Sequence, residues 1–548
     1  DAKEADGLDI SLDVIEAVFS DPDLDGWEGF GLVVQAYQKR ALPVLQWVLD
    51  LSRRVGRKMR LRLVKGAYWD AEIKIAQVEG LEGYPVFTRK ASTDVSYQAC
   101  AGLLLDNRDV IYPQFATHNA YSVAYVLERA QGEPSGFEFQ RLHGMGDGLY
   151  EKLVAENSVP VCIYAPVGEH KSLLAYLVRR LLENGANSSF INNIVDADIP
   201  LESLIINPVH NVLEHTHRVN PNIPKPVAIY GDDRDNSHGV DLTDIPRMMA
   251  LAENTRHWDE THISEECVVA TGEIVSRNPA DTREILGVAQ NATAAQIAAK
   301  LERAVSAYAL WSATAVTERA ACLLRLGDKL EQHMDELIVI CTREAGKVTK
   351  DGIAEVREAV DFCRYYAGQG QAVCSTHPGW GDAGQLESRG VVLCISPWNF
   401  PLAIFLGQIT AALAAGNAVL AKPADTTFLV ATRALELMED CGFPSDVVQL
   451  VVAKGRTVGE TIVPDERIAA VMFTGSTSVG AWISRKLAQR PGPRIPLIAE
   501  TGGQNCLIVD STALPEQVVD DVISSGFLSA GQRCSALRVL FLQEDVAD

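Results

Sequence analysis

Short apolar segments alternate with longer helical segments through the first third of the chain, and this alternation restricts the possible folds more than any other feature. The segments predicted to be strands are 31–37, 61–68, 110–118, 138–145 and 159–167. Strand then helix, repeated with nearly continuous apolar strands, is typical of a parallel sheet or barrel covered by helices. Only these strands are clear, so residues 1–199 are predicted to form a partial (βα)8-type barrel whose first strands are missing.

A second alternation of strands and helices occupies residues 264–497. Long helices are expected at 292–309 and 317–344. The strands expected after them are 390–395, 418–422, 447–452 and 470–474. This order is typical of a doubly wound Rossmann-type domain, in which ligands bind at the carboxyl ends of the strands. Proline, glycine and asparagine are dense within 200–263, which we interpret as a connecting region. Residues 498–548 would begin a further, catalytic domain.

The overall composition narrows the function classes. At 548 residues the chain is too long for one core, so more than one domain is expected. The formal charge of −23 disfavours nucleic-acid binding, because phosphate recognition needs a basic stripe and none is visible. Eleven cysteines without a CxxC pair suggest reduced thiols in the cytoplasm. No nearby cysteine or acidic residue completes a usual ligand set with His210, His215 and His217, so no metal site is expected.

Two residues near the carboxyl end suggest chemistry on an aldehyde. The thiolate of Cys534 would be a good nucleophile toward a carbonyl carbon, and the carboxylate of Glu500 could activate the water that later releases the acyl group. Asn399, between two prolines, offers a side-chain amide for the oxyanion. Taken singly, these residues have plainer interpretations. Cys534 could be a small buried hydrophobe, and Asn399 could cap a helix that begins near residue 401.

Other groups at the ends of expected strands suit a nucleotide. Lys422 ends one strand, and Gly475, Ser476 and Gly480 lie at a strand-to-helix turn, although isolated glycines usually mark ordinary turns. This set of residues, in this order, resembles the NAD(P)-dependent aldehyde dehydrogenase superfamily. The resemblance implies that NAD binds at Lys422, Gly475, Ser476 and Gly480, and that Cys534, Glu500 and Asn399 are catalytic.

Polar and aromatic residues also follow the expected barrel strands. The run 62–70 offers two cations and two aromatic rings, which suit a phosphate group and a ring system. A later run contains Arg179 and Arg180, whose guanidinium groups suit a carboxylate. A surface pair of Arg179 with Glu183 is the plainer alternative. Together with 116–119, 142–146 and 164–168, these runs resemble the flavin-dependent proline dehydrogenase barrel.

A barrel of this kind followed by an aldehyde dehydrogenase segment resembles the bifunctional proline utilization A family, and the resemblance implies FAD in the first half and NAD in the second. The residues implied to line the flavin are Gln35, Arg62, Lys65, Trp69, Thr117 and His118. The residues implied to hold proline are Asp1, Tyr68, Tyr164, Arg179, Arg180 and Glu183. Without the family, His118 would be interpreted as a satisfied core histidine.

The activity implied by this resemblance is proline catabolism in two steps. L-proline would be oxidised to 1-pyrroline-5-carboxylate, which opens to L-glutamate γ-semialdehyde, and the semialdehyde would be oxidised to L-glutamate through a cysteine thioester. The resemblance also implies a quinone as electron acceptor, a homo-oligomer, and a cytoplasmic enzyme that can contact the inner face of the membrane. The chain is expected to be a fragment of a longer parent, without the glutamate that grips the nicotinamide ribose and without a substrate-binding lysine.

Two rival functions remain open from the sequence. One is a monofunctional aldehyde dehydrogenase that carries an inert barrel as a scaffold. The other is a regulator whose amino-terminal DNA-binding module lies outside this sequence.

Overall fold

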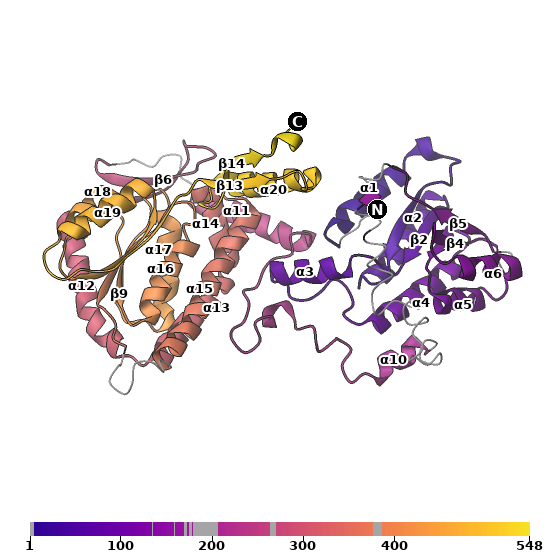
Figure 1. The fold of residues 1–548 in the computed structure, drawn as a ribbon, viewed down its shortest axis with the longest axis horizontal. Helices are drawn as coiled ribbons and strands as arrows, with labels where there is room; N and C mark the ends of the chain where they lie inside the picture. The colour runs from indigo at the N-terminus through magenta and orange to yellow at the C-terminus, as the bar shows by residue number, and fades with distance from the viewer. Residues whose placement is uncertain are drawn as a thin grey trace. The chain divides into compact units, whose positions relative to one another are not determined.

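The computed structural model describes residues 5–133, 135–157, 159–168, 173–174, 178, 206–262, 270–375 and 386–547. The chain divides into two compact units, Asp1–Ile229 and Tyr230–Asp548, which are drawn from indigo to magenta and from pink to yellow in Figure 1. Within the region predicted to connect the domains, α10 (Pro208–Glu214) belongs to the first unit and α11 (Ile245–His262) to the second.

A five-stranded parallel sheet forms the centre of the first unit. Its strands follow one another in chain order: β1 (Gly31–Gln35), β2 (Met59–Val64), β3 (Ile111–Ala116), β4 (Glu138–Leu142) and β5 (Val161–Tyr164). Each predicted strand is therefore confirmed, with somewhat shorter bounds. Sequential order with parallel pairing is the winding of a (βα) barrel, which confirms the predicted fold class for this unit.

Helices connect and cover these strands. They are α1 (Leu8–Phe19), α2 (Ala41–Val55), α3 (Trp69–Glu79), α4 (Lys90–Asp106), α5 (Ala120–Arg129) and α6 (Asp147–Asn157). In β2, Met59, Leu61 and Leu63 are fully buried in the core that the helices share. Because side chains alternate along a strand, Arg60 and Arg62 take the opposite face. The sheet therefore has one apolar face for packing and one face that can hold polar ligands.

The second unit contains another five-stranded parallel sheet, in the order β10-β9-β8-β11-β12. The strands are β8 (Val391–Ile395), β9 (Ala418–Lys422), β10 (Val448–Leu450), β11 (Ile468–Gly475) and β12 (Leu497–Thr501). From β8 the chain adds strands on one side, then returns to add β11 and β12 on the other. The order therefore reverses between β8 and β11, which is where ligands bind in doubly wound sheets. The sequence analysis identified each of these strands except β12.

Helices lie on both faces of this sheet. α12 (Ala294–Ala313) packs on one face and α16 (Ala403–Ala414) on the other, as Figure 1 shows around β9. The other long helices are α13 (Val316–Gln332), α14 (Met334–Ala345), α15 (Thr349–Ser375), α17 (Phe428–Met438) and α19 (Thr477–Gln489), with the short α18 (Gly455–Thr461) between β10 and β11.

One predicted helix in this unit is wrong. The segment 317–344 was expected to be continuous, but it forms α13 and α14, which meet at His333. His333 leaves helical geometry with φ −103° and ψ 20°, and its Nδ1 lies 3.0 Å from Oε2 of Glu336. The break has no glycine or proline, so the helical pattern continues through it.

Two smaller pairs of strands complete the unit. β6 (Glu273–Arg277) and β7 (Ile285–Gln290) form an antiparallel hairpin. β13 (Asn505–Val509) and β14 (Leu537–Leu542) pair in parallel, with α20 (Pro515–Phe527) between them in the chain. This last pair carries the loop that contains Cys534.

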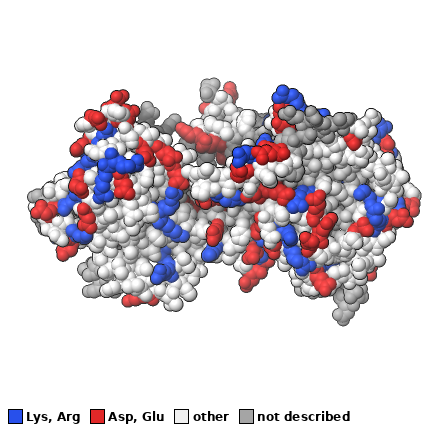
Figure 2. All heavy atoms as spheres, turned by 180° about the vertical axis from the view of Figure 1, so that it is seen from behind, with Lys and Arg blue, Asp and Glu red and all other residues white. Residues whose placement is uncertain are grey.

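On the face drawn in Figure 2, Lys and Arg side chains are interspersed with Asp and Glu. Over the parts of the chain that the structure describes, no helix is both long enough and apolar enough to span a bilayer.

Candidate active sites

The residues predicted to line the flavin collect at one edge of the first sheet. Gln35 ends β1, Lys65 follows β2, and Thr117 and His118 follow β3. Since all the strands are parallel, their carboxyl ends lie at the same edge, as they do around the active site of a barrel.

Arg62 and Tyr164 are in contact across this edge. The guanidinium carbon of Arg62 lies 4.9 Å from the ring centroid of Tyr164, which ends β5. The Nε of Arg62 donates to Oε1 of Gln140 at 2.6 Å, and Gln140 is buried in β4. Arg62, predicted to line the flavin, and Tyr164, predicted to hold proline, are thus adjacent. Their separation in the sequence gives no sign of this contact.

Lys65 forms an ion pair with Asp94 of α4. Its ammonium nitrogen also lies 5.7 Å from the ring centroid of Tyr97. The side chain of Trp69 is held by a bond from its Nε1 to the carbonyl oxygen of Phe87, at 2.8 Å. The segment 87–97 therefore orients both Lys65 and Trp69.

The turn after β3 is tied to β4 and α6. The backbone N–H of Leu142 donates to Nε2 of His118 at 3.2 Å, so this ring nitrogen acts as an acceptor. The hydroxyl of Tyr150 donates to the carbonyl oxygen of Thr117. These contacts fit a structural histidine, and the assignment of His118 to the flavin stays a prediction.

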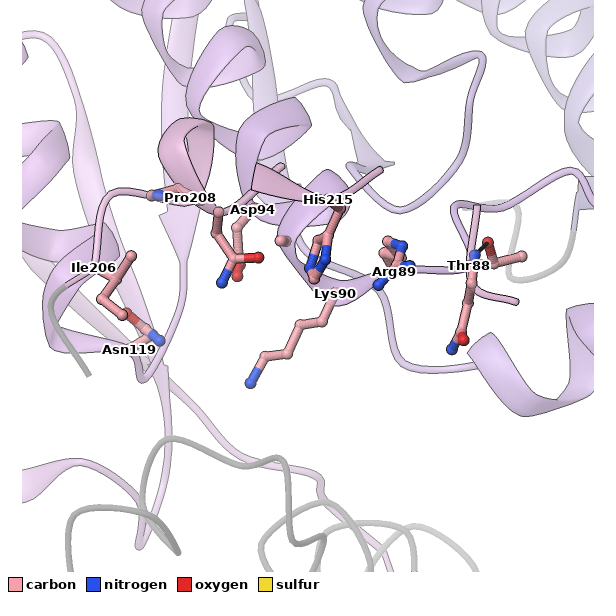
Figure 3. Close-up of a pocket in the computed structure, with 11 residues that line it drawn as sticks. Thr88, Arg89, Lys90, Asp94, Asn119, Ile206, Pro208 and His215 are labelled. Carbon is pink, nitrogen blue, oxygen red and sulfur yellow. Dashed lines mark hydrogen bonds between the residues drawn. The ribbon is translucent and has the colours of Figure 1, made fainter. Parts of the chain in front are cut away.

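A cavity of about 410 Å³ opens beside this edge. Its lining includes Arg89, Lys90, Asp94, Asn119 and His215, whose side chains surround the opening in Figure 3. Burial lowers the pKa of Lys90. Arg89 is the N-cap residue of α4 and Lys90 is its first residue, so two cations lie at a helix amino terminus, where anions bind. The sequence analysis missed both.

The remaining substrate residues are only partly described. Tyr68 is the half-buried N-cap residue of α3. Asp1, Arg179, Arg180 and Glu183 lie outside the described residues, so their grouping around proline stays a prediction.

In the second unit, the turn that carries Asn399 meets the turn that carries Cys534. The side-chain Nδ2 of Asn399 donates to the carbonyl oxygen of Gln532 at 2.6 Å. The amide group has two N–H donors, so this bond leaves another for a ligand. Asn399 lies in the loop after β8, at the reversal of strand order. The alternative role of Asn399 as a helix cap is wrong, because α16 begins at Ala403 and Leu402 is its N-cap residue.

The turn that carries Cys534 has an unusual backbone. Ser529 and Ala530, just before Cys534, have φ values of 56° and 54°, a region that residues other than glycine seldom adopt. Cys534 is exposed, in contrast to Cys341, Cys363 and Cys394, which are buried. The alternative of a buried structural thiol at Cys534 is therefore wrong.

Asn505 connects the segment that follows Glu500 to the turn that carries Cys534. Its Nδ2 donates to the carbonyl oxygens of Cys534, at 2.7 Å, and Ala536, at 3.0 Å. Glu500 lies five residues earlier in β12, where it pairs with Thr474 at the end of β11. The segments that contain Glu500 and Cys534 are therefore joined through Asn505, a residue that the sequence analysis did not select.

The predicted cofactor residues lie along the same edge of this sheet. Lys422 is buried at the end of β9, and its Nζ lies 2.7 Å from Oδ1 of Asp425, which was also missed. Ser476 is the N-cap residue of α19, and its hydroxyl accepts from the N–H of Val479 at 3.4 Å. A Cβ on Gly480 would lie 3.2 Å from Cγ2 of Thr501, so a glycine lets α19 approach the sheet closely.

The helix that follows the Lys422 turn, α17, is capped by a residue from another element. Oε1 and Oε2 of Glu344, in α14, accept from the N–H groups of Leu429 and Val430 at 2.8 and 2.9 Å. Ser276 donates to Oε1 at 2.9 Å. Burial raises the pKa of Glu344 from an ordinary value of 4.5 to about 7.

This raised pKa predicts a pH dependence of stability. Between the two pKa values, the folded protein keeps a proton at Glu344 that the unfolded chain has released. The contribution of Glu344 is therefore fully present below the unfolded pKa and is lost as the pH rises through about 7, by roughly 3 kcal/mol. We expect Glu344→Gln to flatten this fall, as measured by urea unfolding of wild type and variant at about pH 5 and pH 8. Parallel pH profiles of the two proteins would contradict the assignment.

Comparisons with known proteins find a different family in each half of the chain. Residues 1–193 match the family model for proline dehydrogenase, and residues 268–548 match that for the aldehyde dehydrogenase family. The bifunctional protein PutA of Escherichia coli is 50% identical over 571 residues, which cover 100% of this chain and 43% of the relative. That of Rhizobium meliloti is 48% identical over 561 residues, which cover 100% of this chain and 45% of the relative. The chain thus spans less than half the length of these curated relatives.

A solved structure is similar along the whole length of this chain. A crystal structure of a mutant of Bradyrhizobium japonicum proline utilization A superposes with a TM-score of 0.90 at 48% identity, covering 100% of this chain and 54% of the other. The 1-pyrroline-5-carboxylate dehydrogenase 2 of Bacillus subtilis is 34% identical over 52% of this chain and 57% of the relative, within the second half. The chain therefore belongs to the proline utilization A family, in which a proline dehydrogenase segment precedes an aldehyde dehydrogenase segment.

Proposed function

We propose that the protein containing this chain oxidises L-proline to 1-pyrroline-5-carboxylate in the first unit and L-glutamate γ-semialdehyde to L-glutamate in the second. The observation that carries the proposal most directly is the contact between the Asn399 turn and the Cys534 turn at the reversal of strand order. It brings an amide donor and a thiol to the place where a doubly wound sheet binds its ligands.

The first unit has groups that fit FAD. Arg89 and Lys90, at the amino terminus of α4, would hold phosphate groups. Arg62 and Lys65 supply further cations, and Trp69 supplies a ring surface. The other residues proposed to line the flavin are Gln35, Thr117 and His118. When bound, FAD would accept hydride from proline.

Proline itself would be held through its carboxylate. Arg179 and Arg180 would form charge-assisted hydrogen bonds with the two carboxylate oxygens. Tyr164 would close the site from β5, where it already packs on Arg62. We assign the remaining positions to Asp1, Tyr68 and Glu183.

The second unit has groups that fit NAD. Lys422 and Ser476 would bind its hydroxyl and phosphate groups at the carboxyl ends of β9 and β11. Gly475 and Gly480 would let the cofactor and α19 approach the sheet. When bound, NAD would accept the hydride that leaves the substrate carbon.

The residues of the second unit would carry out acyl transfer. The Cys534 thiolate would attack the aldehyde carbon, forming a carbon–sulfur bond as the carbonyl electrons move to oxygen. The Asn399 amide and the backbone N–H of Cys534 would donate to that oxyanion. Loss of hydride leaves a thioester on Cys534. Glu500 would then take a proton from water, whose attack releases glutamate and restores the thiolate.

Three further features are proposed on family resemblance: a quinone that accepts electrons from the flavin, assembly as a homo-oligomer, and a cytoplasmic location with peripheral contact at the inner face of the membrane. We propose no nucleic-acid partner for this segment.

Spectroscopy of the purified full-length gene product tests the proposed function. Proline should bleach the flavin absorbance, and the semialdehyde with NAD should produce NADH. Production of NADH without any proline-dependent bleaching would overturn the proposal in favour of a monofunctional aldehyde dehydrogenase with an inert barrel. The absence of both signals would leave the catalytic proposal without support and would favour a regulator.

A further inference from the structure

The junction between α14 and α15 buries ionisable residues that the proposed mechanism does not use. Glu344, Lys347, Asp351 and Glu355 are exposed by only 3, 7, 5 and 2%. Buried charges destabilise a fold unless each is paired and hydrogen-bonded. The partners of these four residues therefore indicate why they are present.

Glu355 holds the helix that follows the Asn399 turn. Its Oε2 accepts from the N–H groups of Leu402 and Ala403, at 3.2 and 2.9 Å. These are the first amides of α16, for which the N-cap residue Leu402 supplies no side-chain acceptor. The position at which the Asn399 loop enters α16 is thus determined by a carboxylate of α15.

Lys347 fixes both Glu355 and the Asn399 turn. Its Nζ lies 3.1 Å from Oε1 of Glu355 and 4.7 Å from the ring centroid of Phe400, the residue after Asn399. The ammonium group therefore compensates the buried carboxylate and stacks on the turn itself.

Asp351 contacts the Cys534 turn. Its Oδ1 lies 3.5 Å from Nη2 of Arg533, the residue before Cys534. The guanidinium carbon of Arg533 lies 5.9 Å from the ring centroid of Phe400. The ring of Phe400 therefore lies near two cations, Lys347 from the 344–355 segment and Arg533 from the turn that carries Cys534.

Glu344 caps the helix after the Lys422 turn, as Glu355 caps the helix after the Asn399 turn. It accepts from the N–H groups of Leu429 and Val430 in the first turn of α17. The N-cap residue Thr427 supplies no side-chain acceptor there. The first turn of α17, which follows the loop from Lys422, is therefore held by a carboxyl group of α14.

We propose that the 344–355 segment is the positioning element of the dehydrogenase site, with Glu355 and Lys347 holding the Asn399 turn, Asp351 the Cys534 turn and Glu344 the Lys422 turn. The junction is itself tightly defined. Gly346 has φ +67°, and a Cβ at this position would lie 3.0 Å from Cγ of Pro279. One short segment thereby sets three turns that come from distant parts of the sequence. The inference rests on the proposed dehydrogenase function.

The test separates the two glutamates by their kinetic effects in the full-length gene product. Glu355→Gln removes the charge that holds the Asn399 turn. The kcat for semialdehyde oxidation should therefore fall by about ten- to a hundredfold, while KM for NAD changes less than about twofold. Glu344→Gln loosens the Lys422 turn, so KM for NAD should rise by about tenfold with kcat within about twofold. A merely structural role would not produce this split.

Glu331→Gln provides the matched control. Glu331 is a half-buried glutamate of α13 that pairs with Arg364 at 3.0 Å and with His238, and none of these partners lies in the three turns. Its variant should keep both kinetic constants. Equal losses of kcat and NAD affinity in Glu355→Gln and Glu344→Gln, unchanged kinetics in both, or the same losses in Glu331→Gln would overturn the inference.

If Glu355→Gln is not recovered folded, Asp351→Asn replaces it, with an expected severalfold loss of kcat at unchanged KM for NAD. An unchanged kcat in Asp351→Asn would then overturn the inference. Failure of the proposed function is distinguishable, because the wild-type protein would then show no semialdehyde oxidation at all.

Discussion

Replacing Cys534 with serine should reduce NADH formation from glutamate semialdehyde by roughly a thousandfold or more, while proline still reduces the flavin. A serine hydroxyl stays protonated where a thiol can ionise, and no base in hydrogen-bond contact with the side chain of residue 534 is seen among the described residues. Proline oxidation should continue because the residues proposed to line the flavin belong to the first unit and Cys534 belongs to the second.

The measurement follows NADH and flavin absorbance on the same sample of the full-length gene product. Cys506→Ser is the matched control, since Cys506 is another exposed cysteine of the second unit, located in β13. It should keep both activities. Loss of both activities in Cys534→Ser, or survival of NADH formation, would contradict the separation into two sites.

Replacing Asn399 with alanine should lower kcat for semialdehyde oxidation by about a hundred- to a thousandfold. The amide is proposed to donate to an oxygen that becomes negatively charged only after attack, so its loss should affect kcat more than KM. The nucleophile itself remains, and the rate at which iodoacetamide alkylates Cys534 should change only severalfold.

Steady-state kinetics and timed alkylation on the same protein check this expectation. A kcat close to that of wild type would exclude Asn399 as an oxyanion donor. A large fall in alkylation rate would instead show that its bond to the carbonyl of Gln532 supports the reactive form of the thiol.

Local patterns in the sequence were sufficient to predict most strands. β9 is an example: the run Ala418–Lys422 is wholly buried, and Gly416, Asn417 and Pro423 bound it, so both its length and its ends were predicted correctly. The barrel strands were predicted for the same reason. Where a boundary depends on a single backbone torsion, as at His333, the pattern of side chains gave no sign of it.

The chemical groups proposed for the dehydrogenase site could also be selected from the sequence, since a thiol, a carboxylate and an amide are recognisable by residue type. The residues that hold them in place were not. Asn505, Asp425, Arg89 and Lys90 were missed because each acts through one or two contacts and none belongs to a periodic pattern. The alternative of Asn399 as a helix cap was wrong because the acceptor for α16 comes from Glu355, 48 residues before Ala403.

The order of strands and helices and the division into two parts could be predicted from residue type and from periodicity within short windows. The contacts between distant turns could not be predicted in this way. Asn399 and Gln532 are 133 residues apart, and their contact depends on the strand order β10-β9-β8-β11-β12 and on the left-handed backbone before Cys534. Such contacts depend on how whole elements pack, a property that no local stretch of sequence contains.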